Sequence, residues 1–338
     1  MDAVVQDHRW LGVGRSDAPA PAGAATEAVR GACEGRSAAL VILFASESYD
    51  LEALAAAADG EAGDATVIGC STAGEIATGG PGDAGVVAVA LGGEGFAVST
   101  AAATGIAADA RRAGAEAAEC LAAVADRPHQ VLLLLTDGLA GDQQEIVRGA
   151  YGVVGAGVPL VGGCAGDDLK MRATHQIHGT EVMQNAVVAA ALASDSPFGI
   201  GVRHGWRRVG EAMLVTDSEL NRVLTIEDQP ALDVYLERLD APASVRSDPE
   251  AFTRFASTHP LGLASRRGEE HVRFVSGADF EARAIACIAE VPRGALTWFM
   301  EGDDDSVLAA TDAACDDALA ALGDRPPLGM LAFDEGES

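Results

Sequence analysis

Two short stretches of small residues, each following an apolar run and ending in acids, combine the groups that a small polar ligand needs. They are TVIGCSTAGEI, residues 66–76, and VPLVGGCAGDDL, residues 158–169. Small residues after a strand leave backbone N–H groups accessible to an anion, and the acids could hold an ammonium group. We therefore predict a site for a small zwitterion or carboxylate. Its candidate residues are Gly69, Cys70, Ser71, Thr72, Gly74, Glu75, Gly162, Gly163, Cys164, Gly166, Asp167 and Asp168.

The same residues also have a structural interpretation. The glycines could simply permit tight packing of a strand against a helix, with Glu75 near the start of that helix. Cys70 and Cys164 occupy similar places in the two stretches, and as nucleophiles they would need a lowered pKa and a base. No His follows a protease-like pattern, and buried Cys in packed turns is the commoner outcome. We expect no catalysis, and an enzyme of unknown substrate stays an alternative.

The segments before the two stretches also match each other. LVILFASESYDLEALAAAA begins at Leu40, and VLLLLTDGLAGDQQEIVRGA begins at Val131; each reads as a buried strand, a turn and a helix. The copies lie roughly 90 residues apart, which suits a duplicated strand–helix–strand unit with a hairpin. The sequence therefore predicts that residues 40–76 and 131–169 share one strand order.

Other elements follow from local patterns. We predict a strand that ends at Ile68, a helix from Thr26, and a hairpin from the apolar runs that begin at Val86 and Phe96. A second hairpin is expected over residues 174–192. Residues 329–334, GMLAFD, read as the start of one more strand. The acids at 137, 142 and 145 are interpreted as favouring a helix N-terminus.

Longer motifs resemble a known family. IGCSTAGEI, LLTDGLAGD and VPLVGGCAGDDL resemble the N-terminal FIST domain, while HGWRRVG, VTDSELNRVLTIEDQPALDVY, PLGL and HVRFVS resemble the C-terminal FIST domain. The resemblance implies a bacterial or archaeal signal-sensing module that binds a small molecule, for which amino acids have been proposed. We expect an α/β fold with mixed sheets. The expected domains are 1–195, with related units at about 36–125 and 126–195, and 196–338, which lacks the last strand–helix–strand unit usual in the family.

One branch that resembles this family binds haem and senses nitric oxide, which makes haem an alternative to the absence of a cofactor. His204, in RHGW, is then the candidate axial ligand, with Trp206 as an aromatic wall and Arg203 and Arg207 near the propionates. A hydrogen-bonded core His is the structural alternative. His175 and His178 would face opposite sides of a strand and make poor joint metal ligands.

Composition limits the partners. The 338 residues carry a formal net charge of −28, which argues against nucleic acid or an anionic membrane. No apolar run is long enough to span a membrane, and the first residues lack an export signal, so we expect a cytoplasmic protein. The 6 cysteines include no CxxC pair, which suits reduced thiols. No output domain is evident, so we expect a partner in trans, such as a histidine kinase or a cyclic-dinucleotide signalling enzyme.

Overall fold

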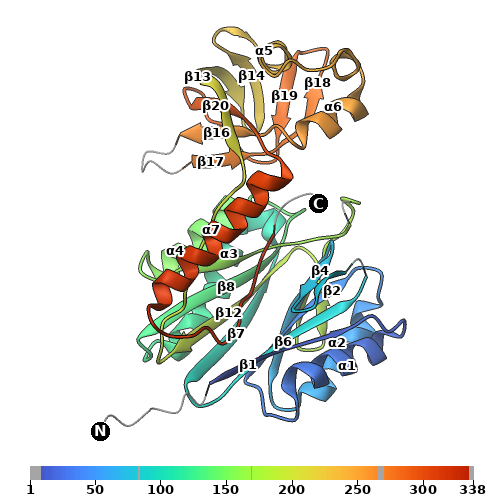
Figure 1. Ribbon diagram of the computed structural model, residues 1–338, viewed down its shortest axis with the longest axis vertical. Helices are drawn as coiled ribbons and strands as arrows, with labels where there is room; N and C mark the ends of the chain where they lie inside the picture. The colour runs from blue at the N-terminus through green and yellow to red at the C-terminus, as the bar shows by residue number, and fades with distance from the viewer. Residues whose placement is uncertain (1–8, 83, 169, 265–269, 335–338) are drawn as a thin grey trace. The chain divides into compact units, whose positions relative to one another are not determined.

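The computed structural model describes residues 9–334 except 83, 169 and 265–269. The chain forms two compact units (Figure 1). The first contains the described residues of Met1–Phe198 and Ala321–Gly336, and the second contains those of Gly199–Ala320. Helices and sheets occur in both, and the sheets of the first unit are mixed, so the predicted α/β class is confirmed.

The first unit contains the predicted duplication. One repeat consists of β1 (Trp10–Ser16), α1 (Pro21–Cys33), β2 (Leu40–Ser46), α2 (Leu51–Ala62), β3 (Thr66–Thr72), β4 (Glu75–Ala77), β5 (Gly80–Gly82) and β6 (Val86–Gly92). The other consists of β7 (Phe96–Thr104), α3 (Ile106–Ala118), the 3-10 helix η1 (Glu119–Val124), β8 (His129–Asp137), α4 (Gln143–Val154), β9 (Leu160–Ala165), β10 (Gln176–His178), β11 (Glu181–Met183) and β12 (Ala186–Ser194). The strand order β1-β6-β2-β3 of the first sheet matches β7-β12-β8-β9 in the second, and β2–β3 and β8–β9 are both parallel. This equivalence confirms the duplication.

The limits of the repeats differ from the prediction. β6 pairs with β1 and β2, whereas β7 pairs with β12, so the predicted hairpin from Val86 and Phe96 is wrong. The short link between these strands resembles a hairpin turn in sequence, but it carries the chain from the first sheet to the second. The repeats therefore run over residues 10–92 and 96–194.

The second predicted hairpin forms only in part, over β10 and β11, because residues 186–192 belong to β12, which pairs with β7 and β8. β10 pairs with β11 and also with β3, where Gln176 lies opposite Cys70. The second repeat thus supplies two strands to the edge of the first sheet. This exchange places residues 174–178 beside the end of β3.

Each sheet is covered on one face by the helices of its own repeat. α1 and α2 pack small and branched side chains, including Ala28 and Leu54, against the first sheet, and α3 and α4 cover the second. Close contact is possible because β1 carries Gly14, where an added Cβ would lie 1.9 Å from the carbonyl oxygen of Ala28. α1 begins at Pro21 rather than at the predicted Thr26, since Pro is favoured in the first helical turn.

The second unit is built around one sheet whose strand pairs are antiparallel. It contains β13 (Arg207–Glu219), β14 (Arg222–Ile226), β15 (Gln229–Pro230), α5 (Ala231–Arg238), η2 (Ala243–Arg246), α6 (Pro249–Ala256), β16 (Leu261–Ala264), β17 (Glu270–Arg273), β18 (Val275–Asp279), β19 (Ala284–Cys287), β20 (Leu296–Glu301) and α7 (Asp304–Leu322). Tyr235 is central to its core, with ring centroids 5.7 Å from Phe252 and 5.2 Å from Phe299. The Tyr235 hydroxyl donates to the carbonyl oxygen of His259 at 2.6 Å. The strand predicted over residues 329–334 does not form.

Candidate functional site

The two Gly-rich stretches meet in the first unit, and Ser71 joins them. Its hydroxyl donates to the carbonyl oxygen of Gly166 at 2.7 Å and accepts from the N–H of His175 at 3.0 Å. Backbone bonds reinforce the junction, because the Gly166 N–H donates to Ser71 and the Ser71 N–H donates to His175, both at 2.9 Å. Ser71 is fully buried, so its hydroxyl is engaged in holding the repeats together.

Most of each stretch lies in a strand rather than in an open turn. β3 continues to Thr72, so the predicted strand end at Ile68 is wrong, and β9 includes Gly162, Gly163 and Cys164. These strands pair with β2 and β8 along their length. The hydrogen bonds between these strands therefore occupy backbone groups that we predicted to be free for an anion.

The two leading glycines permit close approach of neighbouring strands. A Cβ at Gly69 would lie 2.4 Å from the carbonyl oxygen of Leu43, and one at Gly162 would lie 2.0 Å from that of Leu134. Both leucines point into the core under their own helices. Gly69 and Gly162 therefore hold equivalent places in the duplicated unit, and the structural role proposed for them is observed.

When Gly69 and Gly162 are taken as equivalent positions, Cys70 and Cys164 are out of register by one residue. Counting from the glycines, the counterpart of Cys164 is Ser71, not Cys70, so the two thiols do not hold matching positions. Cys70 is buried, and burial raises its pKa to about 12, which leaves little thiolate near neutral pH. Cys164 is exposed, and the Thr136 hydroxyl lies 3.5 Å from its Sγ.

The acids of the second stretch are engaged by the protein. Burial of Asp167 opposes its ionisation, but backbone N–H groups of residues 171–173 donate to the carboxylate at 2.6–3.1 Å and lower its pKa. Asp168 pairs with Lys170, which also contacts Glu47. These contacts organise the loop after β9.

Glu75 differs from these acids, because part of its carboxylate is unsatisfied. It begins β4, so the helix that it was expected to precede is absent. Oε1 accepts from the Thr72 hydroxyl at 2.6 Å, whereas Oε2 is buried and has no hydrogen-bond partner among the described residues. Burial raises the pKa of Glu75, and the Thr72 hydroxyl, the backbone N–H of Gly85 and the charge of Arg15 oppose this shift in part. The adjacent Gly74 is exposed, and its N–H makes no hydrogen bond within the described chain.

Asp137 does not act at a helix N-terminus, so the role predicted for it is wrong. Asp142 does cap α4, as its position suggested, by accepting from the N–H of Gln144. Asp137 is instead buried and accepts from the Thr174 hydroxyl at 2.7 Å and the Asn185 N–H at 2.6 Å. It fixes the ends of the β10–β11 hairpin, a pairing that only the tertiary fold reveals.

The candidate haem residues lie in the second unit. His204 is exposed in a stretch without regular secondary structure. Arg203 pairs with Asp317, and Arg207 pairs with Asp303 at 2.7 Å, so both arginines expected near propionates already have carboxylate partners. Among the described residues, no group of three or more His, Cys, Asp or Glu side chains could hold a metal ion.

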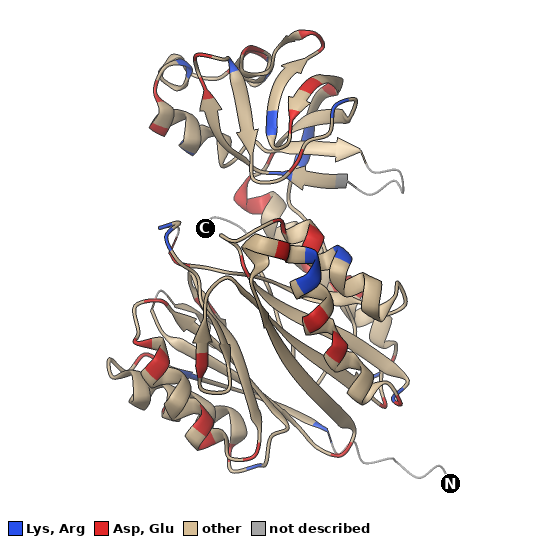
Figure 2. Cartoon of the chain, turned by 180° about the vertical axis from the view of Figure 1, so that it is seen from behind, with Lys and Arg blue, Asp and Glu red and all other residues tan. Residues whose placement is uncertain are grey.

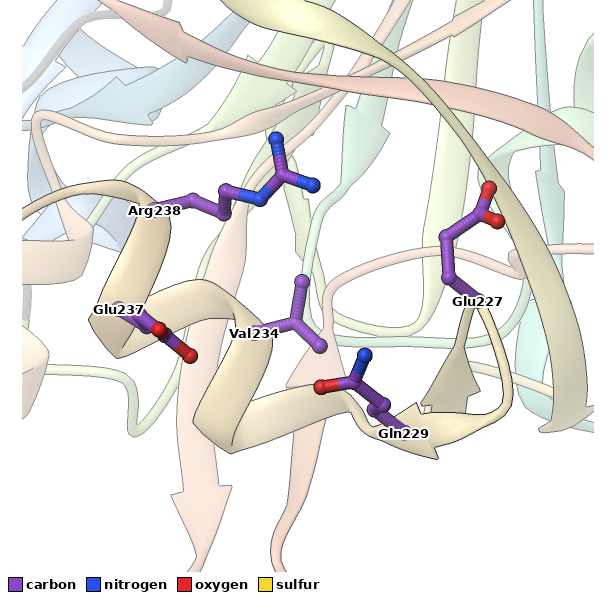
Figure 3. A pocket seen from close by; sticks show the side chains of 5 residues that line it. All are labelled: Glu227, Gln229, Val234, Glu237 and Arg238. Carbon is purple, nitrogen blue, oxygen red and sulfur yellow. The ribbon is translucent and has the colours of Figure 1, made fainter.

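A hollow of about 200 Å³ lies in the second unit between the β14–β15 hairpin and α5, and no residue that was predicted to bind ligand lines it. It is lined by Glu227, Gln229, Val234, Glu237 and Arg238. Figure 3 shows the Glu227 carboxylate and the Arg238 guanidinium on opposite sides of it. Oε1 of Glu227 accepts from the N–H of Leu214 at 2.6 Å, which fixes one wall. In the sequence, the spacing of polar residues around Pro230 was the only indication of this hollow.

The chain as a whole is strongly acidic. The chain has 51 Asp and Glu against 23 Lys and Arg. Figure 2 shows acidic residues over the helices and loops of both units. Such an excess attracts cationic groups over several ångströms. No helix in the described chain is long and apolar enough to cross a membrane.

The fold and the junction of the repeats define a two-domain α/β protein whose first domain is internally duplicated. The family model described as FIST N domain matches residues 39–229, and that described as FIST C domain matches residues 231–334. The chain therefore belongs to the FIST family, as its motifs indicated. FIST domains are generally small-ligand sensory domains in signal transduction.

Other comparisons add little. No curated protein matches the chain. A crystal structure described as "cyanuic acid hydrolase from A. caulinodans" is similar over 57% of this chain and 73% of that chain, with 12% sequence identity and a TM-score of 0.31. A similarity at this level has no bearing on function.

Proposed function

We propose that this protein is a sensor that binds a small zwitterion or carboxylate, such as an amino acid, beside Glu75. The observation that supports this most directly is the buried Oε2 of Glu75, which makes no direct hydrogen bond among the described residues, although the backbone N–H of Gly85 acts on the same carboxylate. An unpaired buried carboxylate oxygen costs stability, and a ligand ammonium group would remove that cost with a charge-assisted hydrogen bond.

The surroundings of Glu75 suit the rest of such a ligand. The Thr72 hydroxyl holds the other carboxylate oxygen, which orients the group. The exposed N–H of Gly74 is a donor for the ligand carboxylate. Access to Oε2 requires the β4–β5 hairpin to move, and this hairpin pairs only through residues 75–77 and 80–82. Binding therefore requires a local opening of the β4–β5 hairpin, and the ligand gains two polar contacts, one with Glu75 and one with Gly74.

In this proposal, ligand binding at Glu75 is signalled through the connection of Glu75 to the second repeat. Only three residues separate Glu75 from Ser71, whose hydroxyl is bonded to Gly166. Movement of the 72–75 segment is therefore transmitted to the loop after β9. We propose a partner in trans, of the histidine kinase or cyclic-dinucleotide enzyme type, which rests on the role of FIST domains in signal transduction.

A thermal-shift screen of the common amino acids and small carboxylates tests this function. A ligand that binds only the folded chain stabilises it by about 2.7 kcal/mol at 100 times its Kd. We expect zwitterions to raise the melting temperature of the wild type and to raise that of Glu75→Gln much less. A panel in which no member shifts the wild type would contradict the proposal.

A further inference from the structure

The chain that follows α7 returns to the first unit as an irregular segment, residues 323–334, which we name the latch. It is the dark red trace beyond α7 in Figure 1. Gly323 ends the helix with φ 63°, and Pro326 and Pro327 disfavour further helix or sheet pairing. The latch joins no sheet, so backbone ladders do not hold it.

Two contacts place the latch on the first sheet. The ring of Phe333 meets that of Phe44 edge-on, with centroids 5.9 Å apart and an interplanar angle of 74°. Gly329 lies against Leu11, since an added Cβ would be 2.5 Å from its Cδ2. Leu43, next to Phe44, points into the helix-covered core, and side chains alternate along a strand. The latch therefore lies on the face of the sheet that α1 and α2 leave uncovered.

The latch is lightly held compared with a strand. Leu328 is 42% exposed and Met330 is 65% exposed, although both are apolar. Phe333 and Leu331 are half-buried, so they supply most of the apolar burial. Segments with few buried contacts open locally at a free energy well below that of global unfolding.

We propose that the latch is a displaceable strap, anchored by Phe333, that opens from the first sheet while the unit stays folded. Phe44 lies opposite Cys70 in the parallel pair of β2 and β3, so the anchor contacts the strand next to the one that leads to Glu75. The latch also continues directly from α7, most of which belongs to the second unit. Its opening uncovers an apolar aromatic surface and frees the segment that follows α7 from the first sheet.

Limited chymotrypsin digestion of the full chain tests the latch without any ligand, so its outcome is independent of the proposed function. Phe44→Ala leaves the latch sequence unchanged and removes its aromatic partner. Cleavage of a transiently opened segment tracks the open population. Mass spectrometry monitors cleavage after Leu331 and Phe333. We expect this cleavage to be about ten times faster in Phe44→Ala than in the wild type, because the variant loses an aromatic pair and the area that the pair buries.

Phe96→Ala is the matched control, because it removes a half-buried ring from the same unit, and that ring lies against Arg9. Its cleavage rate should equal that of the wild type. Equal rates in Phe44→Ala and Phe96→Ala would overturn the proposal. If circular dichroism shows that Phe44→Ala is unfolded, Gly329→Ile replaces it as the test, because a side chain at this position of the latch would meet Leu11. Faster cleavage of Gly329→Ile supports the proposal, and an unchanged rate overturns it.

Discussion

Substitution of Ser71 by Ala should weaken the junction of the two repeats more than its size suggests. The change removes one oxygen atom from a fully buried position and leaves the carbonyl of Gly166 and the N–H of His175 without their partner. A buried group left unsatisfied costs about 1–3 kcal/mol. Two such groups give an expected loss of about 2–4 kcal/mol in the free energy of unfolding.

Urea unfolding, followed by far-UV circular dichroism, measures this loss. For a domain of roughly 200 residues, 1 kcal/mol corresponds to about 2–4 °C, so the melting temperature in a thermal scan should fall by about 4–16 °C. Ser99→Ala is the control, because Ser99 is half-buried in β7 and its hydroxyl makes no hydrogen bond among the described residues. A loss no larger than that of Ser99→Ala would refute the assignment of Ser71 as the tie between the repeats.

Three further predictions concern ionisation, packing and thiol reactivity. Because burial raises the pKa of Glu75, the folded state binds its proton more tightly than the unfolded chain does, and the wild type loses this stability as the pH rises. Glu75→Gln should therefore gain stability relative to the wild type from about pH 4 to pH 7 in urea titrations; a constant difference would contradict this. Gly162→Ala should cost more than about 3 kcal/mol, since its φ is 125° and a Cβ meets backbone, whereas Gly152→Ala, in an open helical position, should gain about 0.5–1 kcal/mol; similar midpoints would be evidence against the close approach. Native labelling with a thiol reagent should modify Cys164 and spare Cys70 until the chain unfolds, and early labelling of Cys70 would show that its burial is wrong.

The duplication was accessible from sequence because each repeat keeps an apolar strand, a helix and a second strand in the same order. Leu40 and Val131 both begin runs without charged residues, which is the pattern of strands buried on both faces. The pairing of β6 and β7 with different sheets was not accessible. Adjacent apolar runs joined by a short Gly-rich link predict a hairpin, and only tertiary packing sends them apart.

The candidate site was predicted in location but less well in detail. Sequence similarity aligns Cys70 with Cys164, whereas the strand pairing in the two repeats aligns Ser71 with Cys164. A difference of one residue along a strand moves a side chain to the other face of the sheet. Ser71 was correctly singled out, but its engagement with Gly166 depends on a contact between the repeats. The unsatisfied oxygen of Glu75 likewise depends on burial, which local sequence does not specify.

Calorimetric titration of the most stabilising amino acid tests the central claim most directly. The wild type is compared with Glu75→Gln and with Glu145→Gln, whose carboxylate pairs with arginines on the helices instead. A charge-assisted hydrogen bond contributes about 1.5–3 kcal/mol, so Glu75→Gln should weaken binding at least about ten-fold, while Glu145→Gln retains the wild-type Kd. Equal affinity in all three proteins would contradict the role of Glu75 as the ligand's ammonium acceptor.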